Sequence, residues 1–240
     1  MPPNRSRTPL IIAIIAGVAC LGLALIVVIA LVIGGVLFTS GDDGDEQGGS
    51  SSSSSQELVP PPGVAEDQPY LELGTSADGP VVDVYVDFLC PHCATFEDLH
   101  GEDLTQLASD GEITLRVHPR PMLDANSSPA GYSSRAANAA VCAYAEDPAQ
   151  WSAAETALFE NQPGEEGLTD EELTSVIDEA TGLDVSSCIT EGTYVPWIQD
   201  VVEPEALETT QGTPTVLIDG EMFTGDLAEP GSVRSAIEQA

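Results

Sequence analysis

The sequence VVDVYVDFLCPHC, residues 81–93, decides the fold. Residues 82–88 alternate between valine or phenylalanine and Asp or Tyr, which predicts a strand over 81–88. After the two cysteines, apolar residues recur at helical spacing, at Phe96, Leu99, Leu104 and Leu107. The cysteine pair therefore precedes a predicted helix over about 94–107. A second strand is predicted over residues 113–117. Such a β-α-β unit predicts an α/β protein with a mainly parallel sheet.

Cys90 and Cys93 are three positions apart at the predicted helix start, and cysteines with this spacing can form a readily reduced disulfide. Cys90 would lie among unpaired backbone N–H groups at the positive end of the helix dipole, which lower the pKa of a thiol. His92 can add positive charge. Because a stabilised thiolate favours the reduced form, the disulfide would be an oxidant. We expect Cys90 to be the solvent-facing nucleophile and Cys93 the buried resolving thiol.

Two other uses of the cysteine pair are a structural disulfide and half of a zinc site. The position between a strand and a helix, with Pro91 inside the pair, favours redox chemistry over a structural bridge. A zinc site would need two more ligands, and His100 and His118 are the only other histidines. We therefore expect neither a metal nor a cofactor.

Residues 87–93, DFLCPHC, resemble the active-site strand and helix start of DsbA-like thiol-disulfide oxidoreductases, which have the thioredoxin fold. Far downstream, residues 212–220, GTPTVLIDG, resemble the cis-proline loop of that family. The resemblance implies that Pro214 is cis and faces the Cys90 sulfur, and that the Thr213 backbone binds an extended substrate segment. It extends loosely from about Val81 to a C-terminal helix over 232–240.

A helical insertion is expected between the two halves of the sheet, because Pro214 follows Cys93 by 121 residues and a β-α-β unit needs only about 30. The sequence predicts helices over 133–145, 148–159 and 185–202. Another begins at Thr169, which forms a capping box with Glu172. The resemblance implies an insertion of this kind, over about 125–205, that caps the active site.

Cys142 and Cys188 both lie in the predicted insertion. In an extracytoplasmic domain we expect them to form a structural disulfide, whose loop of about 47 residues would contribute about 4 kcal/mol of stability. The alternative is a second redox pair that passes electrons to Cys90 and Cys93.

One departure from the family pattern concerns a buried acid. Thioredoxin and many DsbA proteins place this acid six residues before the first active-site cysteine, where the present chain has Val84. The role often given to that acid, taking the proton of the second cysteine, is therefore unassigned. Asp87 lies on the opposite face of the strand from Val84 and is expected to be exposed or to cap the helix.

The surroundings of three further side chains can be predicted. Arg120 is expected to pair with surface acids, with a substrate as the alternative partner. Trp151 and Trp197 are expected to pack between helices.

The N-terminal part of the chain predicts a membrane anchor. Residues 10–38 contain no charge and are long enough, at about 1.5 Å per residue, to span a hydrocarbon core of about 30 Å. Arg5 and Arg7 precede this span and acids follow it, which predicts a cytoplasmic tail over 1–9 and an extracytoplasmic remainder. Residues 39–62, rich in Ser, Gly and acids and ending in prolines, predict a linker to one domain over 63–240.

The net charge of −34, without any lysine, excludes nucleic acid and polybasic membrane docking as functions. The sequence thus indicates a membrane-tethered, outward-facing oxidase that introduces disulfides into secreted proteins. By resemblance its reoxidant is a membrane quinone-linked protein of the DsbB or vitamin K epoxide reductase type. The alternatives are an isomerase or reductase of the same fold, or a redox-inactive peptide-binding or chaperone module.

Overall fold

The structure is a computed structural model that describes residues 58–164 and 166–240. The predicted cytoplasmic tail over 1–9, the predicted anchor over 10–38 and the linker up to residue 57 lie outside the described residues. Among the helices of the described residues, none combines the length and the apolar character that a membrane crossing requires.

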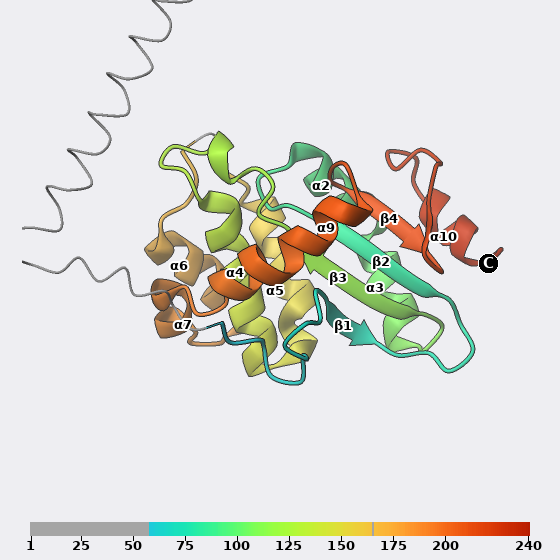
Figure 1. Ribbon diagram of the computed structural model, residues 1–240, viewed down its shortest axis with the longest axis horizontal. Helices are drawn as coiled ribbons and strands as arrows, with labels where there is room; N and C mark the ends of the chain where they lie inside the picture. The colour runs from blue at the N-terminus through green and yellow to red at the C-terminus, as the bar shows by residue number, and fades with distance from the viewer. Residues whose placement is uncertain (1–57, 165) are drawn as a thin grey trace, which may run out of the picture. The chain divides into compact units, whose positions relative to one another are not determined.

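A five-stranded mixed sheet with the strand order β1-β3-β2-β4-β5 carries the domain (Figure 1). β2 and β3 pair in parallel, which confirms the predicted β-α-β unit. The other three pairs of neighbouring strands are antiparallel, so the expectation of a mainly parallel sheet was wrong. The first strand was not predicted, because a stretch of four residues shows too few alternations to stand out. The strands are β1 (Leu71–Gly74), β2 (Val81–Val86), β3 (Thr114–Pro119), β4 (Thr215–Ile218) and β5 (Glu221–Met222).

The helix after the cysteine pair is not one regular helix. It begins as α2 (Pro91–Phe96), widens into a π-helical turn over Glu97–Gly101 and continues as α3 (Glu102–Ser109). Glu97 in the turn accepts a hydrogen bond from the Thr156 hydroxyl, 2.7 Å away. Gly101 makes room for this arrangement, since a Cβ at that position would meet the Glu97 carboxylate.

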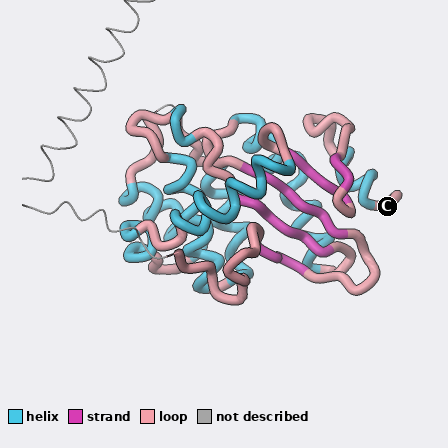
Figure 2. Tube along the Cα trace, viewed as in Figure 1, coloured by secondary structure: helices cyan, strands magenta, loops and turns pink. Residues whose placement is uncertain are grey.

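The insertion consists of helices, as predicted, packed beside the sheet (Figures 1 and 2). The capping box of Thr169 and Glu172 is present at the start of α6, and the irregular stretch over 185–202 is broken into short helices. The helices after β3 are a 3-10 turn (Asp124–Asn126), α4 (Tyr132–Glu146), a 3-10 turn (Pro148–Gln150), α5 (Trp151–Glu160), α6 (Asp170–Thr181), α7 (Ser186–Glu191), α8 (Val195–Trp197), a π-turn (Ile198–Val202) and α9 (Glu203–Thr209). The last helix is α10 (Ser232–Ile237).

Both faces of the sheet are covered. Val82, Val84 and Val86 of β2 belong to the main core, which also contains buried side chains of α3, α10 and the insertion. On the other face α9 lies across the sheet, and its Ala206 packs with Tyr85 and Leu217 (Figure 1). This double cover explains why β2 is buried on both faces although its sequence alternates.

Trp151 and Trp197 are buried among helices, which confirms their expected packing role. Their indole N–H groups donate to Glu155 at 2.6 Å and to the Gln68 carbonyl at 3.0 Å, respectively.

Arg120 pairs with an acid, as expected, but the expectation of a surface location was wrong. It is 1% exposed because the chain passes beneath α9 directly after β3. Its guanidinium donates to both carboxylate oxygens of Glu203, at 2.8 and 2.9 Å, and to the Thr210 hydroxyl at 2.7 Å. Arg120 is therefore held inside the protein, where it ties β3 to α9, and is unsuited to binding a substrate.

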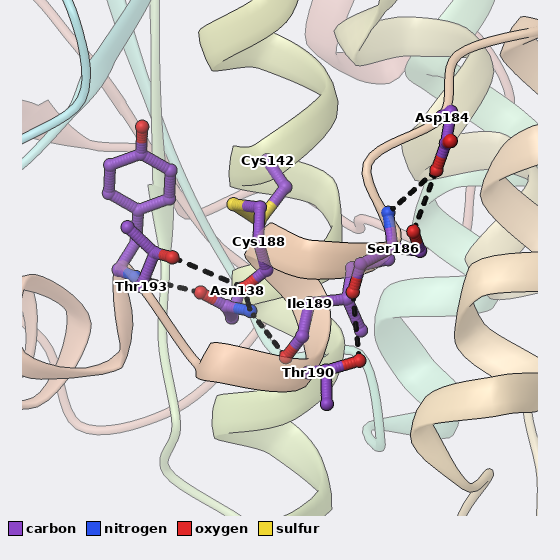
Figure 3. Close-up of a disulfide and its surroundings, with 9 residues drawn as sticks. Asn138, Cys142, Asp184, Ser186, Cys188, Ile189, Thr190 and Thr193 are labelled. Atoms are coloured by element: carbon purple, nitrogen blue, oxygen red, sulfur yellow. Dashed lines mark hydrogen bonds between the residues drawn. A yellow bond between two sulfur atoms is a disulfide. The ribbon is translucent and has the colours of Figure 1, made fainter.

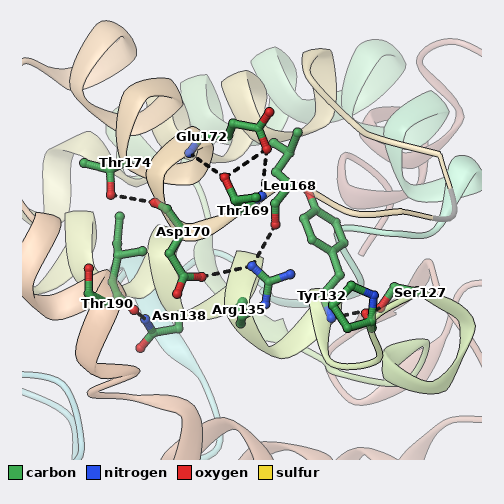
Figure 4. A network of polar contacts seen from close by, with 12 residues as sticks. Ser127, Tyr132, Arg135, Asn138, Leu168, Thr169, Asp170, Glu172, Thr174 and Thr190 are labelled. Carbon is green, nitrogen blue, oxygen red and sulfur yellow. Dashed lines mark hydrogen bonds and ion pairs between the residues drawn. The ribbon is translucent and has the colours of Figure 1, made fainter.

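Polar contacts also hold the insertion together (Figure 4). Arg135 of α4 donates to the Leu168 carbonyl at 2.7 Å and to the Asp170 carboxylate at 2.9 Å. Because Leu168 and Asp170 flank the capping residue Thr169, this arginine joins the first turn of α4 to the N-terminus of α6.

The structure joins Cys142 of α4 to Cys188 of α7 by a disulfide, with a Cα–Cα distance of 6.0 Å (Figure 3). Asn138, one helical turn before Cys142, supports the same junction. Its amide donates to the Cys188 carbonyl at 3.3 Å and accepts from the Tyr194 N–H at 2.8 Å. The disulfide thus lies in a hydrogen-bonded junction between two helices of the insertion.

We predict that Cys142 and Cys188 stay bonded while the other pair is reduced. The two sulfur atoms are held together by packed helices and the Asn138 hydrogen bonds, so a reduced pair would close again. The Cys90–Cys93 pair differs because its reduced form is stabilised by the low pKa of Cys90. After mild reduction of the folded protein and alkylation, peptide mapping by mass spectrometry should find label on Cys90 and Cys93 but not on Cys142 or Cys188. Reduction in denaturant, the control, should add Cys142 and Cys188. Label on either of these in the folded protein would instead favour a second redox pair.

Candidate active site

The backbone between β2 and α2 places the two cysteines at the start of a helix. Cys90 is the N-cap residue of α2, with φ −77° and ψ 116°, and Pro91 occupies the first helical position. Proline suits that position because its missing N–H would have no helical partner there. The Cys90 N–H donates to the Asp87 carbonyl at 3.0 Å, and the Cys93 N–H to the Cys90 carbonyl at 3.0 Å. The CPHC sequence therefore forms the tight turn that its position predicts.

Cys90 and Cys93 carry free thiols in this structure. The Cys93 side chain is fully buried, as expected, and its sulfur accepts a hydrogen bond from the Asp87 N–H at 3.5 Å. Cys90 is less open than predicted, with 5% of its surface exposed. The reason is the loop before β4, since the Cys90 sulfur lies 3.4 Å from the Thr213 carbonyl oxygen.

The environment shifts the pKa values of the two thiols in opposite directions. The hydrogen bond with Cys93 is the main cause that lowers the pKa of Cys90 to about 5, against the effect of burial. The backbone N–H groups of Cys93 and His92 act in the same direction. Burial raises the pKa of Cys93 well above its ordinary value, and the bond to Cys90 adds to this. At neutral pH Cys90 is therefore a thiolate and Cys93 a thiol.

His92 contributes to the site through its backbone as well as its side chain. The side chain is exposed, and the contribution of this residue to the low pKa of Cys90 comes through its backbone N–H. Its ring instead lines a surface cavity of about 270 Å³ beside the cysteines. Other residues of this cavity are Thr95, Thr213, Pro214, Asp226 and Leu227.

The loop before β4 brings Thr213 and Pro214 to the cysteine pair across more than a hundred residues of sequence. The Thr213-Pro214 peptide bond is cis, the isomer that the resemblance implies. Because proline has no N–H and the Thr213 carbonyl faces Cys90, the loop offers acceptor groups next to the reactive sulfur.

Gln162, just after α5, is a site residue that the sequence reasoning missed. Its side-chain amide donates to the Phe88 carbonyl at 2.8 Å and to the Cys90 carbonyl at 3.1 Å. These bonds hold the turn that carries the nucleophile. No local pattern marks Gln162, because its role depends on the packing of the insertion against the turn.

Asp87 is buried, so the expectation of an exposed or capping residue was wrong. It has no exposed surface, since the loop after β3 and the N-terminus of α4 cover it. Its carboxylate accepts hydrogen bonds from the Leu89 N–H, the Leu123 N–H and the Ser133 hydroxyl, at 2.7 to 2.8 Å. Burial raises its pKa to about 6, against these three hydrogen bonds.

The two histidines considered as zinc ligands have other partners. The Nε2 atom of His100 lies 3.0 Å from the Leu227 carbonyl oxygen. His118 lies between the carboxylates of Asp83 and Glu205, 3.0 and 3.4 Å away, and stacks on Tyr85. Neither ring forms a hydrogen bond with Cys90 or Cys93 within the part of the chain that the structure describes.

Known proteins match the part of the chain that contains the cysteine pair and the loop before β4. A family model described as thioredoxin matches residues 68–239. Reduced DsbA of Mycobacterium tuberculosis is 27% identical, with a TM-score of 0.60 over 71% of this chain and 91% of that chain. DsbG of the same organism, a disulfide bond oxidoreductase, is 28% identical, with a TM-score of 0.57 over 78% of this chain and 84% of that chain.

Two further proteins are similar to this chain. MdbA, a thiol-disulfide oxidoreductase from Actinomyces oris, is 29% identical, with a TM-score of 0.58 over 68% of this chain and 81% of that chain. Among curated proteins, the serine/threonine-protein kinase PknE of Mycobacterium tuberculosis is 29% identical over 101 residues, which are 41% of this chain. The chain matches only 18% of the length of that kinase.

We predict that the Cys93 thiol sets the acidity of Cys90. Hydrogen bonds to charged groups contribute about 1.5 to 3 kcal/mol, so Cys93→Ala should raise the pKa of Cys90 by about one to two units. Cys93→Ser keeps a hydroxyl donor and should raise it less. The measurement is the pH dependence of the alkylation rate of Cys90, followed on its own peptide. Equal pKa values in the Ala and Ser variants would contradict the assignment.

Proposed function

The chain belongs to the DsbA-like thioredoxin family, and on this premise we propose that it is a protein-disulfide oxidoreductase that acts chiefly as an oxidase. The observation that supports this most directly is the opposite shift of the two thiol pKa values in the active site. A thiolate that is stable at neutral pH favours the reduced enzyme, so the Cys90–Cys93 disulfide tends to accept electrons from substrate thiols.

The reaction starts from the Cys90–Cys93 disulfide. A substrate thiolate attacks the Cys90 sulfur, and Cys93 leaves and takes up a proton, because its pKa in the buried site is high. A second substrate thiolate then attacks the substrate sulfur of the mixed disulfide, and Cys90 leaves as a stable thiolate. Two electrons pass from the substrate to the enzyme, and the substrate leaves with a disulfide.

Substrate binding is assigned to the surface around the loop before β4. An extended segment that pairs with the Thr213 backbone would lie over the cavity formed by that loop, His92 and the Asp226–Leu227 segment. The small size and the mixed apolar and polar lining of this cavity suit short stretches of unfolded chain rather than one defined ligand. Secreted proteins with free thiols are therefore the proposed substrates.

Membrane tethering is proposed from the sequence. The uncharged residues 10–38 support a single-pass anchor with a cytoplasmic N-terminus, and the acidic, serine-rich residues that follow support a tether. An anchored oxidase would meet a membrane quinone-linked reoxidant of the DsbB or vitamin K epoxide reductase type. That partner would return the Cys90–Cys93 pair to the disulfide after each cycle.

An isomerase or reductase is the second candidate. Thr213 before the cis-proline is also found in such enzymes, and the domain is as similar to DsbG as to DsbA in sequence. A redox-inactive peptide-binding module is less consistent with the site, because both cysteines are present and their pKa values differ strongly.

We predict that Cys93→Ser traps mixed disulfides with secreted proteins and that Cys90→Ser does not. Cys93 is the thiol next to Cys90, so without it the Cys90–substrate bond loses the neighbouring group that would attack it. Non-reducing gels of cells that express the full chain should show the trapped complexes in the membrane fraction. Equal trapping by both variants would remove the assignment of the nucleophile, and complexes in the soluble fraction would remove the proposed tether.

The direction of electron flow can be tested by the reduction potential of the Cys90–Cys93 pair. An oxidase should lie nearer to about −120 mV, the value of DsbA, than to about −270 mV, the value of thioredoxin. Equilibration with glutathione buffers measures it, and oxidation of reduced, unfolded ribonuclease gives the matching activity. A value near that of thioredoxin, with reduction of insulin instead, would favour the reductase.

A further inference from the structure

The Asp87 carboxylate contacts the turn that carries the cysteines. Its backbone N–H donates to the Cys93 sulfur, and its carboxylate binds the Leu89 N–H on the same turn. The other bonds come from Leu123, in the loop after β3, and from the Ser133 hydroxyl at the start of α4. The side chain therefore joins the active-site turn to the helical insertion from a fully buried position.

The titratable groups around Asp87 are few. Cys90 and Cys93 lie on the side of α2, and Tyr132 lies on the side of α4. Burial is the main cause that raises the pKa of the Tyr132 hydroxyl; the Arg135 charge lowers this pKa and the Asp87 charge raises it. Asp124, next to Leu123, directs its carboxylate to the N–H and hydroxyl of Ser134 instead. Within the described residues Asp87 has no basic side chain as a partner, so its charge is balanced by hydrogen bonds alone.

We propose that Asp87 is a positioning residue that takes up part of a proton when the Cys90–Cys93 disulfide is reduced and releases it when the disulfide forms again. The proposal rests on the proposed redox function of the pair. It gives this chain a buried acid next to the cysteines at a position other than Val84, where thioredoxin has its acid.

The reason is electrostatic. Reduction converts an uncharged disulfide into a Cys90 thiolate and a Cys93 thiol, which places a negative charge beside the buried Asp87 carboxylate. Two like charges in a site of low polarity oppose each other, so the carboxylate holds a proton more tightly in the reduced enzyme. In this structure, where both thiols are free, burial is the main cause that raises the pKa of Asp87 to about 6, and the Cys90 charge acts in the same direction.

The protons and electrons balance in this scheme. A substrate dithiol gives up two electrons and two protons when it becomes a disulfide. The electrons reduce the Cys90–Cys93 bond, and one proton goes to Cys93. When the pH is above the pKa of Asp87, the second proton goes to solvent. When the pH is near that pKa, Asp87 takes up part of this proton, and Cys90 remains a thiolate.

The direct test compares the acidity of Asp87 in the two redox states of the wild-type full chain in detergent micelles. The chemical shift of its carboxyl carbon, assigned through its backbone resonances, is followed by NMR from pH 4 to pH 8. We expect the acid dissociation constant to be at least about threefold smaller in the reduced protein, which is half a pKa unit. The same constant in both states would overturn the proposal, and this measurement needs no variant that has to fold.

Variants separate the charge of Asp87 from its structural role. Asp87→Asn removes the charge, so at pH 8 its equilibrium constant for reduction by glutathione should exceed that of the wild type by about three- to tenfold, where tenfold is about 30 mV. The difference should disappear towards pH 5, where wild-type Asp87 becomes neutral. A difference of the same size at every pH would reflect a structural change and would overturn the proposal.

Two further variants serve as controls. Asp124→Asn removes a neighbouring carboxylate that binds Ser134 rather than the active-site turn, and it should follow the wild-type profile within about twofold. Ser133→Ala removes a donor to the Asp87 carboxylate and should therefore raise the pKa of Asp87. When this change is added both to the wild type and to Asp87→Asn, the pH at which their equilibrium constants become equal should move upward. No such movement is expected if Asp87 is not the group that titrates. If Asp124→Asn abolished the pH dependence, the proton would lie on Asp124 and not on Asp87.

Failure of this inference is distinguishable from failure of the proposed function. A wild-type Cys90–Cys93 pair that does not cycle between dithiol and disulfide in glutathione buffers would overturn the redox function itself. A pair that cycles while the acidity of Asp87 stays constant would overturn only the role of Asp87.

Discussion

The hydrogen bond between the Cys93 thiol and the Cys90 sulfur is the interaction on which the active site depends. It is the largest of the effects that lower the pKa of Cys90, and it exists because α2 begins at Cys90 and brings Cys93 round to the same side after one turn. The rest of the site maintains this geometry. Gln162 holds the Cys90 carbonyl, the Asp87 N–H holds the Cys93 sulfur, and the Thr213 carbonyl closes the site from the other side.

The overall charge of the protein makes this local stabilisation more important. The chain has a formal net charge of −34, and each of the four arginines in the described residues is paired with at least one carboxylate. The surplus of acids opposes any additional negative charge, a thiolate included. Because salt screens surface charges but not short hydrogen bonds inside the protein, the thiolate has to be stabilised by neighbouring N–H and S–H groups.

The sequence predicted those features whose signals are local or are carried by family motifs. The strand–CPHC–helix unit, the capping box at Thr169 and the helical character of the insertion follow from periodicity and short-range hydrogen bonding. Asp87, Arg120 and Gln162 behave differently, because their environments are created by segments far away in the sequence. An aspartate next to a strand is usually exposed, and only the loop at Leu123 and helix α4 with Ser133 bury this one. The first strand and the π-turn at Glu97 also depend on packing that no short window contains.

The insertion is therefore a structural part of the active site and not only a cover over it. Gln162 follows α5 and binds two carbonyls of the turn, and Ser133 of α4 binds the carboxylate at the turn's beginning. The turn after the end of a strand has several backbone groups without partners, and burying such groups without hydrogen bonds costs free energy. The insertion supplies these partners, so the positions of the two sulfur atoms depend on the packing of its helices. The disulfide between α4 and α7 fixes one of these helices, because α4 also carries Ser133, which binds the Asp87 carboxylate.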